Sequence, residues 1–367
     1  MQSQRFRPLV DTTGPFVSVY FDDTHDTQDA AAQLDARLRD VRKHLEEQSV
    51  SAAVIEAIDT AVRAAHPPVG RSGRGVIAAG ERIVFDEHLI RPPVSTVVRV
   101  SELPYLVPVI EHGVSHASYL TVAVDHTGAD IALHRDGRAG AETVTGSGHP
   151  VHAAHRAETS GYGGPQGRVE EAVRKNIREV AHRVTELVDE TAPDIVFVTG
   201  EAGARAELVS ELPERVTAMT VQLHGGGRTG GIDEDEVRHE MSAEFARRRQ
   251  AATDDAAAHF AAGRGTGLAV EGLADVAAAL RDGAVATLII GDLGEAILVA
   301  DHDRLMVGTD AATVSDLGGS PDRVVRADEA LPLLAVATGA ALVSAGGQLA
   351  PADGIGAVLR YPDVGAR

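Results

Sequence analysis

Short apolar runs of strand length alternate along this chain with longer stretches whose apolar residues recur every three or four positions. Residues 15–21 form an apolar run of the first kind, and Leu34, Leu38, Val41 and Leu45 then repeat with helical spacing. Because side chains repeat every two residues in a strand and every 3.6 in a helix, this change of period predicts strands followed by helices. We therefore expect an α/β protein of layered sheets and helices.

The chain is too long for one typical domain, and breaks in the pattern divide it into three. Four prolines between residues 92 and 108 precede the first break. We predict an N-terminal α/β domain over residues 1–113, a middle domain over 114–232 with a glycine-rich loop at 137–167, and a C-terminal domain over 233–367 that starts with a linking helix.

Composition narrows the possible functions. There is no run of about 18 apolar residues and no apolar signal region, so a cytoplasmic protein is expected. The absence of cysteine excludes disulfides, thiolate nucleophiles and cysteine-based zinc sites. A net charge of -20 repels phosphates, and the lack of tryptophan removes strong stacking platforms, so contact with nucleic acid must depend on local basic faces.

The middle domain has the clearest order of elements. Its pattern predicts a hairpin of strands at 119–125 and 130–134, the loop, a helix from 168 to about 190, a strand at 194–199, a helix near 201–212 and a strand at 216–223. The loop is rich in Gly, His and Ser and has no periodicity, which is typical of a functional loop.

Basic residues lie on both sides of this loop. Arg135, Arg138 and Arg156 come before its end, and the following helix carries Arg168, Arg174, Lys175 and Arg178. One interpretation is a positive island, in an otherwise acidic protein, that meets RNA. The other is a solvated helix whose basic residues pair with acids four positions away, as in Glu170–Arg174, Glu171–Lys175 and Glu179–Arg183.

Three histidines, His149, His152 and His155, repeat every third residue within the loop. Imidazoles are zinc ligands, but a rigid scaffold and a helical HExxH motif are missing, so we expect neither a metal nor a cofactor and favour histidines that face solvent or RNA.

Two segments of the C-terminal domain resemble a known family. GLADVAAALRDGAVATLIIGD at 272–292 and GAALVSAGGQLAPADGIGAVLRY at 339–361 are similar to the C-terminal domain of the archaeal and eukaryotic class-one release factor and of Pelota. The hairpin, glycine-rich loop and basic helix of residues 119–190 follow the order of the release-factor middle domain. The resemblance implies middle and C-terminal domains with layered α/β sheets like those of release factors.

Release factors carry a catalytic Gly-Gly-Gln motif in the middle-domain loop. The corresponding residues here are Gly163, Gly164, Pro165 and Gln166, so a proline is inserted that removes an amide donor and fixes φ. A literal Gly-Gly-Gln at 346–348 lies between two predicted strands of the C-terminal domain, where we expect a structural turn.

The resemblance is strongest to a bacterial branch of the family that includes the ribosome hibernation factor Balon. It implies a protein that occupies the A site of idle or stalled 70S ribosomes, inserts the middle-domain loop toward the peptidyl-transferase centre and is delivered by elongation factor Tu. The residues implied to contact rRNA are Arg135, Arg138, His149, His152, His155, Arg156, Gly163, Gly164, Pro165, Gln166, Arg168, Arg174, Lys175 and Arg178.

Two other functions stay open. In the first, the chain is a ribosome-rescue peptidyl-tRNA hydrolase whose Gln166 coordinates the attacking water; otherwise no catalytic residue is expected. In the second, it is a regulatory scaffold that binds another protein through its acidic surface.

Overall fold

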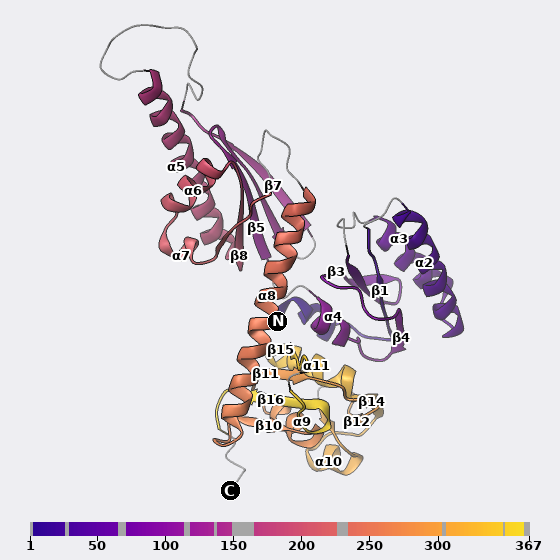
Figure 1. The fold of residues 1–367 in the computed structure, drawn as a ribbon. Coiled ribbons are helices and arrows are strands. Elements are labelled where there is room, and N and C mark those ends of the chain that lie inside the picture. Colours follow the sequence, from indigo (N-terminus) through magenta and orange to yellow (C-terminus); the bar gives the residue numbers. More distant parts are fainter. Residues whose placement is uncertain are drawn as a thin grey trace. The chain divides into compact units, whose positions relative to one another are not determined.

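The computed structural model describes residues 3–25, 29–64, 71–113, 118–135, 138–148, 165–225, 234–302, 306–347 and 349–362. The chain forms two compact units. Met1–Ser115 and Phe245–Arg367 together make the first, and His116–Glu244 makes the second, here called the middle unit. Helices and sheets alternate through both units (Figure 1), so the predicted α/β class is confirmed. The first unit joins both terminal segments of the chain, and the division into three domains stays a prediction.

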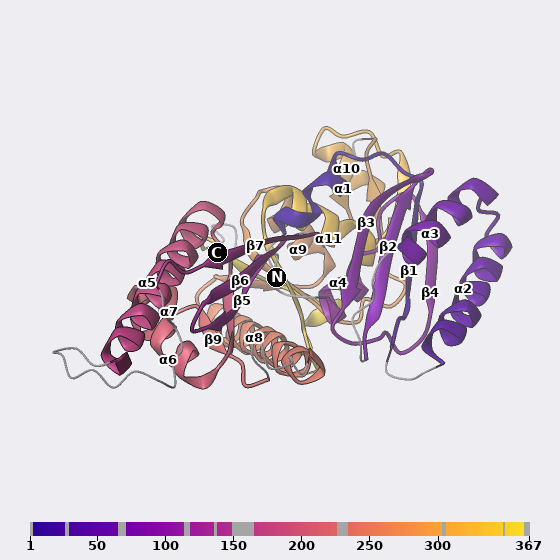
Figure 2. The same cartoon turned by 90° about the horizontal axis from the view of Figure 1, so that it is seen from above.

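The N-terminal part of the first unit is an antiparallel sheet with the order β3-β2-β1-β4 and two helices, α2 and α3, against one face (Figure 2). Alternate residues of β1 serve opposite faces: Val19 and Phe21 pack with α2 and α3, whereas Phe16 and Tyr20 join the core on the other side. The elements are η1 (Gln4–Phe6), α1 (Arg7–Val10), β1 (Phe16–Asp22), α2 (Ala30–Glu47), α3 (Ala52–Ala64), β2 (Gly73–Ala79), β3 (Arg82–Leu89), β4 (Val97–Ser101) and α4 (Val107–His112).

The C-terminal part of the first unit contains two sheets. Strands β10-β16-β11-β15 form one and β13-β12-β14 the other, and β11 runs parallel to β15. The elements are α8 (Glu234–Gly263), which passes from the middle unit into the first unit, β10 (Ala269–Glu271), α9 (Leu273–Arg281), β11 (Val285–Ile290), β12 (Ile297–Ala300), β13 (Val307–Gly308), α10 (Ala311–Asp316), β14 (Arg323–Arg326), α11 (Ala327–Thr338), β15 (Ala341–Ser344), η2 (Ala352–Gly354) and β16 (Ile355–Leu359).

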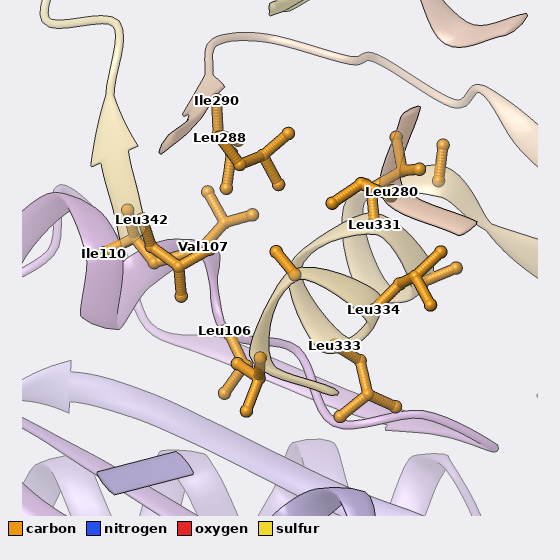
Figure 3. Close-up of a cluster of buried hydrophobic side chains, with 14 of the residues drawn as sticks. Leu106, Val107, Ile110, Leu280, Leu288, Ile290, Leu331, Leu333, Leu334 and Leu342 are labelled. Atoms are coloured by element: carbon orange, nitrogen blue, oxygen red, sulfur yellow. The ribbon is translucent and has the colours of Figure 1, made fainter. Parts of the chain in front are cut away.

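One hydrophobic core joins the two parts of the first unit. Val107 and Ile110 of α4 lie beside Leu342 of β15, and Leu106 lies beside Leu333 of α11 (Figure 3). All of these side chains are at most 8% exposed. Because removing so much aliphatic surface from water stabilises the contact, the N-terminal sheet is held on the C-terminal part by α4 and α11.

The middle unit is a five-stranded sheet with the order β7-β6-β5-β8-β9. The pairs β5–β8 and β8–β9 are parallel, whereas β5–β6 and β6–β7 are antiparallel. Helices α5 and α6 share a core with β5, β6 and β8. The elements are β5 (Ser118–Asp125), β6 (Gly128–Arg135), β7 (Arg138–Thr145), α5 (Pro165–Thr191), β8 (Ile195–Gly200), α6 (Ala202–Glu211), α7 (Glu214–Thr217) and β9 (Thr220–Gln222).

Two predictions for the middle unit were wrong in part. The loop was expected at 137–167, but Arg138–Thr145 form strand β7, which pairs with β6 along its whole length. The expected strand at 216–223 is instead the end of α7 followed by the short β9. Val216 is buried, but it belongs to helix α7 and not to a strand. The predicted hairpin at 119–134 and the helix after the loop are confirmed.

The expected turn after the strand at 341–344 is confirmed. Gly346 and Gly347 adopt φ values of 59° and 73°, which glycine reaches without steric cost. Gln348 lies outside the described residues. Among the helices that the structure describes, none is long and apolar enough to cross a membrane.

Candidate functional site

Helix α5 carries an exposed basic face on the N-terminal half of its length. Arg168, Arg174, Lys175 and Arg178 are all exposed, whereas Ile177 on the opposite side is buried in the core of the middle unit. At 100° per residue, the four basic residues fall within about one third of the helix circumference. We call Arg168, Arg174, Lys175 and Arg178 the basic face.

Three of the four residues of the basic face form no ion pair with an acid in the part of the chain that the structure describes, although the charge of Lys175 helps to lower the pKa of Glu179. Arg178 approaches Glu171 at 3.3 Å, and both side chains are more than half exposed. Arg168, Arg174 and Lys175 form no ion pair with any residue that the structure describes. Exposed pairs such as Arg178–Glu171 contribute little, so the positive charge of the face remains available.

The second interpretation of the helix, in which its basic residues pair with glutamates four positions away, was wrong for Glu179 and Arg183. Arg183 forms two hydrogen bonds to Glu142 of β7, at 2.6 and 2.9 Å, in place of one to Glu179. Glu179 accepts hydrogen bonds from the backbone N–H and the hydroxyl of Ser147, and these lower the pKa of its carboxyl. Tertiary contacts therefore take these side chains, because they lie on the flank of α5 that packs on β7.

The order of charges along α5 is the reverse of what favours an isolated helix. Cations stabilise a helix near its C-terminus and anions near its N-terminus, because of the helix dipole. Here the first turn has no acidic residue and the last turn has no basic one. Arg168 lies near the start, whereas Asp189 and Glu190 lie near the end. Helix stability therefore does not explain the basic face.

Asn176 fixes the chain where it leaves β7. Its side chain is fully buried; its Oδ1 accepts from the Gly148 N–H at 2.6 Å, and its Nδ2 donates to the carbonyls of His126 and Gly148 at 2.9 and 3.2 Å. A Cβ added at Gly146 would lie 2.1 Å from Asn176 Oδ1, so this approach requires glycine. Asn176 was not predicted from the sequence, although an asparagine among the buried positions of an amphipathic helix is a signal for such a contact.

Arg135 lies at the other end of the helix. Its guanidinium donates to the carbonyl of Thr191, the last residue of α5. At 1.5 Å per residue, that end is about 35 Å from Arg168. Arg138 begins β7 directly opposite Arg135 in the register. The single positive island predicted around the loop is therefore wrong for Arg135, which serves as a cation at the C-terminus of α5.

The remaining predicted residues fall in or beside the segment after Gly148. His149, His152, His155, Arg156, Gly163 and Gly164 lie outside the described residues. Pro165 and Gln166 are the first two residues of α5. Proline suits the first helical position because that N–H has no partner within the helix. Within the described parts of the chain, no group of three or more His, Asp or Glu side chains is placed to hold a metal ion.

Comparison with known proteins places the chain in a family. The sequence profile of the bacterial archaeo-eukaryotic release factor family 2 matches residues 118–266, which include the hairpin, α5 and all of α8. MT2704 and Rv2629, from Mycobacterium tuberculosis strains CDC 1551 / Oshkosh and ATCC 25618 / H37Rv, are each 50% identical over 363 residues, which is 98% of this chain and 97% of theirs.

Two solved structures give weaker similarities. A ribosome-bound archaeal Pelota with ABCE1 is 14% identical, with 98% of this chain and 93% of that chain covered and a TM-score of 0.40. The Pelota of Archaeoglobus fulgidus is 12% identical, with coverage of 99% and 92% and a TM-score of 0.35. From the profile and the mycobacterial relatives, the chain belongs to the bacterial archaeo-eukaryotic release factor family 2, and the predicted family is confirmed.

Proposed function

We propose that this protein is a cytoplasmic translation factor that binds the 70S ribosome through the basic face of α5. The observation that carries this proposal is that Arg168, Arg174 and Lys175 are exposed without an ion pair to any described residue, in a chain of net charge -20. Exposed cations without internal partners are suited to RNA phosphates, because binding releases counterions from the nucleic acid. Membership of a release-factor family makes rRNA the partner of choice.

The proposed position is the A site of idle or stalled ribosomes. Gly148 is tied to the buried side of α5 by Asn176, and α5 begins at Pro165, so the residues that flank segment 149–164 lie on the N-terminal half of α5, which also carries the basic face. We place this segment toward the peptidyl-transferase centre, as the family's loop implies. The protein then blocks tRNA entry and preserves an inactive ribosome, as a hibernation factor related to Balon. Elongation factor Tu is the proposed delivery partner.

The test is sedimentation with purified 70S ribosomes at several salt concentrations. Arg174→Glu combined with Arg178→Glu is expected to weaken binding by at least about tenfold, because each reversal replaces attraction to phosphate by repulsion. Arg39→Glu combined with Arg264→Glu is the matched control, since both arginines are exposed in the first unit and far along the chain from α5. Equal binding by the two double variants, or no binding by the wild type at low salt, contradicts the proposal.

Occupancy of the A site needs a separate readout. The wild type is expected to compete with aminoacyl-tRNA for empty 70S ribosomes, and the α5 double variant to compete at least about tenfold less well. A density map of the complex that shows segment 149–164 away from the peptidyl-transferase centre would exclude the proposed loop position while leaving ribosome binding intact.

Peptidyl-tRNA hydrolysis is the alternative function. Gln166 is the second residue of α5 and thus lies at the same end of the helix as the basic face. Incubation with stalled ribosomes should then release the nascent peptide, and Gln166→Ala should abolish release. If the wild type and Gln166→Ala release the peptide equally, Gln166 is not the catalytic residue. If neither releases it, the enzymatic function is excluded.

A further inference from the structure

A small cavity in the first unit is lined by two arginines that the basic face does not include. It has a volume of about 180 Å³ and is bounded by α4, by residues 246–253 of α8 and by β15 with the turn after it. Ile110 and Leu342, which meet in the shared core of Figure 3, form its apolar side. The polar side is supplied by Arg91, Arg249, Glu111, Gln250, Thr253 and Ser344.

Arg91 and Arg249 both line the cavity, and neither forms an ion pair with an acidic residue that the structure describes. Arg91 is exposed and forms no hydrogen bond or ion pair with any described residue. Arg249 donates through Nη1 to the backbone carbonyl of Glu111 at 2.8 Å, which leaves its other donors free among the described contacts. Burial, and then the charge of Arg91, lower the pKa of Arg249. Two cations that repel each other across a cavity favour an anion between them.

The nearest carboxylates do not neutralise this pair. The Glu111 carboxyl faces His112, with 3.6 Å between Oε2 and Nε2, and its pKa is raised by burial and by the charge of Asp292. The pKa of His112 is lowered by burial, by Arg249 and by Arg91, so this imidazole is neutral at pH 7. Neither Arg91 nor Arg249 pairs with an acidic side chain in the described parts of the chain.

The size and the remaining lining select a small, oxygen-rich group. Pockets that enclose drug-sized ligands exceed roughly 300 Å³, so the 180 Å³ found here suits one phosphoryl group and not a whole nucleotide. Ser344 adds a hydroxyl, whereas the Thr253 hydroxyl donates to the backbone carbonyl of Arg249 at 3.2 Å. Gly346 closes the cavity in a left-handed conformation, and an added Cβ would lie 3.2 Å from Thr253 Cγ2. Arginine forks and hydroxyls are the donors that phosphate oxygens accept best.

We infer that the cavity between α4, α8 and β15 is a binding site for a phosphate group, held by Arg91 and Arg249. The phosphate belongs either to a free phosphomonoester or to an RNA backbone, because both present the same oxyanion at the mouth of the cavity. This site lies in the first unit, and its argument uses no residue of the basic face.

The test measures binding of inorganic phosphate and of AMP to the full chain by calorimetry or by chemical-shift changes. Arg91→Gln and Arg249→Gln are each expected to weaken binding about tenfold, since each removes a charged hydrogen-bond donor. Arg39→Gln removes the same charge from exposed helix α2 and should bind like the wild type. Arg91 forms no hydrogen bond with a residue that the structure describes, so its variant stays informative if Arg249→Gln fails to fold.

Wild-type binding that Arg91→Gln leaves unchanged overturns the inference, as does the absence of phosphate and AMP binding to the wild type. The source of the phosphate is assigned by competition with a single-stranded RNA oligonucleotide that has a 5′ hydroxyl. If the RNA displaces phosphate from the wild type and does not bind Arg91→Gln, the site is supported with RNA as its ligand. Binding of AMP without displacement by RNA supports the site with a free phosphomonoester.

The same titration separates this inference from the ribosome proposal. Arg174→Glu combined with Arg178→Glu should bind phosphate like the wild type, whatever its behaviour on ribosomes. A failure of ribosome binding therefore leaves the phosphate site standing, and a failure of phosphate binding leaves the basic face standing.

Discussion

Arginines have opposite environments in two regions of this molecule. In the first unit, Arg99 lies over the Tyr105 ring at 3.6 Å and forms ion pairs with Asp328 at 2.9 Å and Glu329 at 3.3 Å. On α5 of the middle unit, Arg174 is exposed and has no ion pair to a described residue. Arg99 joins β4 to α11 and so belongs to the fold, whereas the fold makes no use of Arg174.

The comparison shows how to separate structural cations from those that bind a partner. Arg74 follows the same pattern as Arg99, because its side chain is 2% exposed and forms two hydrogen bonds of 2.8 Å to Asp86. In an acidic protein, carboxylates are available to neutralise any arginine that needs one. Arginines left without a carboxylate at one end of a helix therefore indicate an anionic partner outside the molecule.

The largest expected effect is on stability and comes from Arg99→Ala. Its removal leaves Glu329, whose side chain is 3% exposed, without its cation, and loss of one partner of a buried pair costs about 3 kcal/mol. Thermal unfolding and hydrogen exchange in β4 and α11 measure the loss. Arg174→Ala is the control and should change stability by less than about 0.5 kcal/mol. Similar losses in both variants would remove the distinction between the two regions.

The next effect is a dependence of stability on pH, which comes from His88 and the charged groups around Arg74 in the first unit. Burial, Arg74 and His25 lower the pKa of His88 from 6.5 to about 4. The unfolded chain therefore binds a proton at His88 more tightly than the folded one, so stability falls as pH decreases from 6.5 toward 4. The loss between pH 7 and pH 5 is about 2 kcal/mol. Asp23, whose pKa is raised by burial, opposes it in part.

Unfolding free energies at pH 7 and pH 5 test this contribution. His88→Gln carries no titrating proton and should lose less stability on acidification than the wild type. His182→Gln, on the exposed side of α5, should keep the wild-type pH dependence. If His88→Gln and the wild type respond equally to pH, the buried cluster of the first unit is not the origin of the acid sensitivity.

The smallest expected effect is a gain. Glu171 is the acid that pairs with the basic face, at 3.3 Å from Arg178. Glu171→Gln frees that guanidinium and should tighten ribosome binding two- to threefold, or about 0.5 kcal/mol, which is typical of one exposed pair. Glu186→Gln at the acidic end of α5 is the control and should bind like the wild type. A weaker complex with Glu171→Gln would mean that this carboxylate contacts the partner itself.

The pattern of neighbouring residues was enough to predict the helix and strands that carry the site. The features that were not predicted depend on contacts between residues far apart in the sequence. The hairpin and α5 follow from residue periodicity, which depends only on neighbours along the chain. Strand β7 was missed because it offers little apolar surface to the core: Val144 packs against the core, whereas Ala141 is exposed. Its pairing with β6 depends on contacts between segments that are not neighbours along the chain. The same holds for Arg183–Glu142 and for Asn176, whose partners are 41 and 28 residues away.

The exposure of the basic face, by contrast, was within reach of the sequence. The predicted helix after the loop carried these basic residues at spacings of three to five positions, which can place several of them on one face. What the sequence left open was whether nearby glutamates neutralise them. Among the described residues, Glu171 pairs with Arg178 at 3.3 Å and Glu179 accepts hydrogen bonds from Ser147, whereas no ion pair joins a glutamate to Arg168, Arg174 or Lys175.

The most direct test of the central claim is the salt dependence of 70S ribosome binding. Neutralised phosphates set the slope of log K against log salt at about 0.7 to 0.9 per contact. With Arg168, Arg174, Lys175 and Arg178 all changed to Gln, the slope should fall by about 3 relative to the wild type, since four phosphate contacts are lost. An unchanged slope would show that the basic face of α5 does not meet rRNA.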